Sequence, residues 1–116
     1  MTEREAEEKV RRLASALGLA ARVDVDRYPG YSAVLLEDGE GGFARAGAGF
    51  AGLDGVWRRA WADLAGLSRP DFAGRPMKAV PCVVFKKGSP AAAVLKSGLP
   101  PEAMEIQAAA RGLGFS

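Results

Sequence analysis

The chain has 116 residues, of which 48% are hydrophobic and 26% charged, and its formal net charge is +2. A chain of this size and composition is typical of one globular domain, which excludes wholesale disorder, and we predict a single domain over residues 1–116. No apolar run reaches the roughly 20 residues that a membrane-spanning helix needs. The acidic N-terminus is unlike a secretory signal, so we expect a cytoplasmic protein with no membrane partner.

Histidine is absent, and cysteine occurs once, as Cys82. Without histidine the chain lacks the usual general base near neutral pH and the commonest transition-metal ligand. This excludes Ser-His and Cys-His catalytic centres and ordinary zinc sites, and a single cysteine excludes an internal disulfide. We therefore expect a protein without a complete catalytic motif and without a cofactor.

The N-terminal segment has the pattern of an amphipathic helix. Thr2 and Glu5 form a capping box, and apolar residues recur at helical spacing from Ala6 to Leu17. Gly18 is a natural end for this helix.

Short alternating segments follow, which predict three strands over residues 22–28, 31–36 and 43–50. Pro29-Gly30 is a turn, and a two-residue hairpin there would place Arg22 opposite Glu37. In that register one face is formed by four apolar side chains and packs against the helices: Val23, Val25, Val34 and Leu36. The glycine-rich end of the third strand, residues 46–50, lacks the Gly-Lys-Ser/Thr of a phosphate-binding loop and predicts a twisted or bulged strand.

The next segment carries the most regular apolar stripe in the chain. It runs from Leu53 to Leu64 and includes Trp57 and Trp61, which we expect in the core. Asp54 can cap this helix and Gly66 can end it.

The C-terminal half is less regular. Residues 68–79 hold two prolines and a glycine and are predicted to be a loop, long enough to suspect a function. Residues 80–85 predict a strand and residues 91–95 a further short strand. Pro100 and Pro101 open a last predicted helix that ends near Gly112.

The predicted order α-β-β-β-α-β-(β)-α indicates an α+β fold. Consecutive hairpins imply a mainly antiparallel sheet of four to five strands, with three helices in a small two-layer domain.

Three segments resemble parts of known families. Residues 80–88 resemble the proline-strand-turn segment of thioredoxins, although no Cys-x-x-Cys is present. The order over residues 2–66 resembles double-stranded-RNA-binding domains, without their lysine cluster at the second helix, where only Arg58 and Arg59 come close. The order α-β-β-β-α-β resembles the core of PD-(D/E)xK nucleases, whose acidic and acid-x-Lys positions are missing here. Order alone is an analogy, so no family is assigned.

The leading interpretation is a non-catalytic interaction module that binds a protein partner or a second copy of itself. It follows from the missing catalytic chemistry, the long Pro/Gly/Arg loop and the apolar content. One alternative is a small enzyme, which would use either Cys82 or a divalent metal held by carboxylates. The candidate carboxylates are Asp24, Asp26, Glu37, Asp38 and Glu40. A cysteine in a Val-rich strand is more often a small buried hydrophobe, and carboxylates more often line a solvated face.

Charge distribution supports an alternative, nucleic-acid binding. Residues 1–40 carry a net charge of −3 and residues 41–116 one of +5, and most of this surplus lies between Arg69 and Lys96. A basic region of this kind can contact phosphates, and it can equally be an ordinary solvated face. The candidate binding residues are Arg58, Arg59, Arg69, Arg75, Lys78, Lys86 and Lys87.

Overall fold

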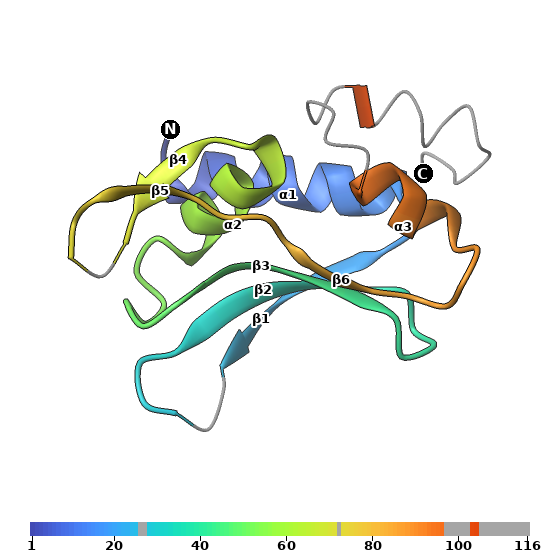
Figure 1. Cartoon of the computed structure of the whole chain (residues 1–116), viewed down its shortest axis with the longest axis horizontal. Coiled ribbons are helices and arrows are strands. Elements are labelled where there is room, and N and C mark those ends of the chain that lie inside the picture. Colours follow the sequence, from blue (N-terminus) through green and yellow to red (C-terminus); the bar gives the residue numbers. More distant parts are fainter. Residues whose placement is uncertain (26–27, 72, 97–102, 105–116) are drawn as a thin grey trace.

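A computed structural model of the chain shows two layers, in which helices cover one face of an antiparallel sheet (Figure 1). The structure describes residues 1–25, 28–71, 73–96 and 103–104. The predicted α+β class is therefore confirmed. None of the helices in these ranges is long and apolar enough to cross a bilayer. In chain order the elements are α1 (Glu3–Ala16), β1 (Ala20–Val25), β2 (Ser32–Glu37), β3 (Phe43–Gly49), α2 (Val56–Ala65), β4 (Ser68–Pro70), β5 (Pro76–Lys78), β6 (Cys82–Val84) and α3 (Pro90–Leu95).

The main sheet has the strand order β1-β2-β3-β6, and every neighbouring pair is antiparallel. The first three strands form a meander because short turns join them. The chain then passes through α2 and a separate hairpin, β4–β5, before β6 adds to the free edge of β3. This hairpin lies beside α2, at one end of the molecule's long axis (Figure 1).

The register of the first hairpin differs from the predicted one by two residues. Ala20 rather than Arg22 lies opposite Glu37, and Val25 lies opposite Ser32, so the connection is longer than a two-residue turn. A shift by two preserves which face each side chain occupies, because the side-chain period of a strand is two. Arg22 still reaches Glu37 diagonally and forms a hydrogen bond with it.

The core lies between the helices and one sheet face. α1 and α2 contribute their apolar stripes, and β3 contributes small alanines that let α2 approach closely. Trp57 is buried as predicted, whereas Trp61 is partly buried and packs against the core. Leu53 and Val25 are exposed, so their predicted places in the core were wrong. Among the described residues, the large apolar side chains that are fully buried are Val10, Leu13, Leu17, Val34, Leu36, Val56 and Val94.

The structure corrects two elements of the C-terminal half. Residues 68–79 are not all loop, because Ser68–Pro70 and Pro76–Lys78 pair as β4 and β5. Both prolines sit at the turn end of this hairpin, where they interrupt little of the ladder. Residues 91–95 form α3 rather than a strand, since Ser89 caps a helix that begins at Pro90. The predicted last helix, 100–112, falls almost entirely outside the described residues.

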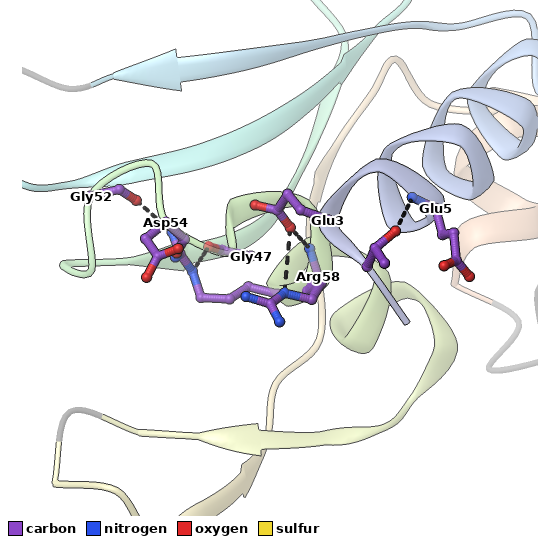
Figure 2. Close-up of polar contacts among 8 residues, drawn as sticks. Glu3, Glu5, Gly47, Gly52, Asp54 and Arg58 are labelled. Carbon is purple, nitrogen blue, oxygen red and sulfur yellow. Dashed lines mark hydrogen bonds and ion pairs between the residues drawn. The ribbon is translucent and has the colours of Figure 1, made fainter.

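The cap of α2 is also not the predicted one. Gly55, not Asp54, is the N-cap residue and it offers no side-chain acceptor. Glu3 of α1 supplies the missing acceptor, because Glu3 Oε1 accepts a hydrogen bond of 2.8 Å from the Arg58 amide (Figure 2). The start of α2 is therefore satisfied by a neighbouring helix, which a local sequence pattern does not reveal.

We predict that Thr2→Ala lowers the free energy of unfolding by about 1 kcal/mol, as loss of an N-cap hydroxyl does. Thr2 Oγ1 accepts the Glu5 amide at 3.1 Å, which confirms this half of the predicted capping box. Denaturant unfolding measures the change, and Thr2→Ser, which keeps the acceptor, is the control. Equal stability of Thr2→Ala and wild type would contradict the assignment.

Candidate functional site

The predicted basic residues are not gathered on one surface. Arg75 and Lys78 belong to the β4–β5 hairpin, and Lys86 and Lys87 lie in the turn between β6 and α3. These two groups occupy opposite ends of the long axis (Figure 1). All four side chains are exposed, but Arg75 Nε lies 3.4 Å from Asp71 and Lys86 Nζ lies 3.5 Å from Glu40.

The lysine end has a hollow of its own. Lys86, Lys87 and Lys96 line an open cavity of about 400 Å³ together with Phe85 and the first residues of α3. These lysines are long and solvated, and the structure fixes none of them in a geometry that specifies a ligand.

Arg69 is buried and paired, unlike the exposed cations. Its Nε lies 2.7 Å from Asp63 Oδ1, and the side-chain exposures of Arg69 and Asp63 are 8% and 3%. Arg69 Nη2 also donates to Asp63 Oδ2 and to the Ala48 carbonyl. This ion pair joins β4 to α2 and to the end of β3.

The side chain of Arg59, on α2, contacts the loop that follows β3. Its Nε donates to the Gly47 carbonyl at 2.9 Å, and its Nη1 donates to the Asp54 carbonyl at 2.7 Å (Figure 2). Its Nη2 donates to Ser32 Oγ and to the Gly52 carbonyl. Four hydrogen bonds therefore hold this guanidinium in one position, and every acceptor is neutral.

The charge of Arg59 is poorly compensated. Burial lowers its pKa from the ordinary value, and the positive charge of nearby Arg69 lowers it further. The carboxylates of Glu3, Asp63 and Asp54 act in the opposite direction. Among the described residues none of them forms an ion pair with Arg59, whereas Asp63 is fully engaged by Arg69.

A bulge in β3 brings these groups together. The register between β2 and β3 shifts between Val34 and Ser32, as the glycine-rich sequence predicted. At the bulge the Gly47 amide turns toward α2 and donates to Asp63 Oδ2 at 2.8 Å. Gly47 has φ of +72°, and a Cβ there would lie 2.5 Å from the Ala60 nitrogen, so only glycine fits.

Above this network lies an open pocket of about 530 Å³. One wall comes from Tyr31, just before β2, and from the end of β3 with the loop that follows it, and the other wall comes from the β4–β5 hairpin. Phe50 is 71% exposed, and its ring contacts Tyr31 edge-on with centroids 5.2 Å apart. The remaining lining is mostly apolar or positively charged: Ala48, Gly49, Ala51, Arg59, Arg69, Pro70, Asp71 and Met77.

Cys82 is exposed, so the expectation of a small buried hydrophobe was wrong. It lies opposite Arg45 on the sheet face away from the helices, whereas its neighbour Val83 lies opposite the buried Ala44 on the core face.

The candidate metal-binding carboxylates are engaged individually. Asp24 pairs with Arg22 and Arg45, and Glu37 pairs with Arg22. Asp38 accepts the amides of its own turn. Among the residues that the structure describes, no group of three or more potential metal ligands comes together. Asp26 lies outside those residues.

Sequence reasoning selected Arg59 and Arg69 but missed their setting. Four other lining residues were not singled out: Tyr31, Phe50, Ala51 and Met77. Phe50 directly follows a glycine-rich segment, and an aromatic residue at such a position was a usable signal. No protein-family model, no curated protein and no solved structure matches this chain.

Proposed function

We propose that the protein is a non-catalytic interaction module, and that it binds a protein partner through the pocket between Phe50 and the β4–β5 hairpin. The observation that carries this proposal is the exposed Phe50, held edge-on by Tyr31 at the rim of an apolar pocket. A large apolar side chain kept in water favours burial against a partner, and aromatic residues are enriched at the centres of interfaces.

The fixed positions of Arg59 and Arg69, which we call the floor of the pocket, support the same proposal. Arg59 is fixed by four hydrogen bonds and Arg69 by a bidentate ion pair, so binding orders little that is not already ordered. A preformed apolar pocket with a few fixed polar groups is the usual form of a recognition site.

Nucleic-acid binding receives less support from the same observations. Its candidate residues are divided between two ends of the molecule, and Arg69 is already neutralised by Asp63. It remains a prediction, tested by whether charge reversal at Lys86 and Lys87 removes salt-dependent binding to labelled DNA or RNA.

Site-specific photocrosslinking tests the proposal. We expect benzoylphenylalanine at position 50 to form a defined adduct in cells of the source species, and the adduct to disappear when Met77→Glu is added. The matched control is the same probe at Val84, which is 48% exposed on the uncovered sheet face. Equal labelling at positions 50 and 84 would contradict the proposal.

Sedimentation equilibrium separates the two kinds of partner. If the partner is a second copy, the wild type sediments as a dimer and Phe50→Ser as a monomer. If the partner is another protein, both sediment as monomers while the adduct at position 50 has the mass of a heteromeric product.

A further inference from the structure

Two fixed guanidinium groups line the pocket, but among the described residues only one carboxylate, that of Asp63, forms an ion pair with either of them. Arg59 and Arg69 both line it, and Asp63 is bound by Arg69 alone. The acidic residue that itself lines the pocket, Asp71, is engaged elsewhere: its Oδ1 accepts the Ala73 and Arg75 amides, and its Oδ2 lies 3.4 Å from Arg75 Nε. Among the residues that the structure describes, the positive charge of Arg59 is therefore left without a carboxylate in direct contact.

Unused hydrogen-bond donors accompany this charge. A guanidinium has five N–H groups. Arg69 uses Nε and Nη2, and within the described part of the chain its Nη1 donates no hydrogen bond. Among the described residues, one side-chain nitrogen or oxygen is buried without a hydrogen-bond partner, and this atom is Arg45 Nε. Arg69 Nη1 is not such an atom, and the Arg69 side chain, which is 8% exposed, lines this pocket, so we place the free Nη1 donors at the pocket.

We infer that this pocket recognises an acidic residue next to a large apolar residue in an extended segment of the partner. The carboxylate binds to Arg69 Nη1 and to the remaining N–H of Arg59 Nη1. The adjacent apolar side chain packs against Phe50, Tyr31 and Met77. This inference rests on the proposed function and specifies the chemistry of the partner at that same site.

One uncompensated positive charge at the pocket favours a singly charged anion. A carboxylate adds the missing countercharge, and its bonds to guanidinium groups are charge-assisted and stronger than neutral ones. It also offsets the two causes that lower the pKa of Arg59, which are burial first and the positive charge of Arg69 second. The preformed positions of both guanidinium groups mean that little side-chain entropy is lost on binding.

Calorimetric titration with three matched peptides tests the inference. They are acetyl-Gly-Asp-Phe-Gly-amide, its Asn-Phe twin, which has the same shape without the charge, and its Asp-Ala twin, which lacks the ring. We expect the Asp-Phe peptide to bind about tenfold more tightly than either twin, the size expected for one charge-assisted contact or one partly buried ring. The preference for Asp over Asn should shrink at high salt.

A pair of protein variants locates the effect. Ala51 is exposed and lines the pocket, so Ala51→Glu places a competing carboxylate there, and Ala51→Gln adds the same bulk without charge. Ala51→Glu should abolish the preference for Asp, and Ala51→Gln should retain it. Circular dichroism verifies that both variants fold.

The outcomes separate this inference from the proposed function. Equal affinity for the Asp-Phe and Asn-Phe peptides, with loss of both on Phe50→Ser, would overturn the carboxylate and leave the interaction pocket in place. Absence of binding by all three peptides, together with no specific adduct at position 50, would overturn both.

Discussion

Gly47→Ala is expected to lower the free energy of unfolding by about 3 kcal/mol, which combines left-handed backbone strain with overpacking. The residue has φ of +72°, and an added Cβ would meet the Ala60 nitrogen at 2.5 Å and the Ala60 Cα at 2.9 Å. Both are atoms of the helix backbone, which cannot move aside as a flexible side chain can. Denaturant unfolding monitored by circular dichroism measures the loss.

Gly39→Ala is the matched control for this prediction. Gly39 has a similar φ of +83°, but nothing lies within 4 Å of the position a Cβ would take. It should lose about 1 kcal/mol, from backbone strain alone. Equal losses in the two variants would show that α2 does not lie in close contact with the bulge at Gly47.

Asp63→Ala has the second large effect. The substitution leaves the nearly buried Arg69 without its counter-ion and removes the acceptor of the Gly47 amide. Removing one partner of a buried ion pair costs about 3–5 kcal/mol, because an uncompensated charge remains inside. We expect a loss in this range, measured by denaturant unfolding monitored by circular dichroism.

The double variant Asp63→Leu with Arg69→Met provides the control for charge. Replacing both partners by apolar residues of similar size removes the desolvation penalty together with the attraction, and this is often nearly neutral. It should therefore be more stable than Asp63→Ala. A double variant less stable than the single one would mean that the ion pair contributes through something other than charge compensation.

The fold was predictable where local signals agree. α1 has an N-cap threonine and a regular apolar stripe. The segments that form β1 to β3 are short and are bounded by turn residues. The existence of these elements therefore follows from residues that lie close together in sequence. The β4–β5 hairpin was hidden because Pro70 and Pro76 indicate a loop, although they lie opposite each other beside its turn. α3 was hidden because an alanine-rich segment of six residues carries no clear period.

The pocket was less predictable because it depends on distant contacts. Asp63 accepts a hydrogen bond from Gly47 and pairs with Arg69, which belong to other elements. From sequence alone Arg59 and Arg69 are indistinguishable from the exposed Arg75 and Lys78. All four residues were therefore grouped as candidate phosphate contacts. Only the bulge at Gly47 had a local signal, the glycine-rich end of β3.

The central claim, that the pocket beside Phe50 is the binding surface, is tested most directly by an NMR titration of ¹⁵N-labelled protein with the Asp-Phe peptide. We predict that the largest shifts fall on the amides of Ala48, Phe50 and Met77 and on the Nε signals of Arg59 and Arg69. Largest shifts at Lys86, Lys87 and Ala92, which line the hollow at the far end, would contradict the claim.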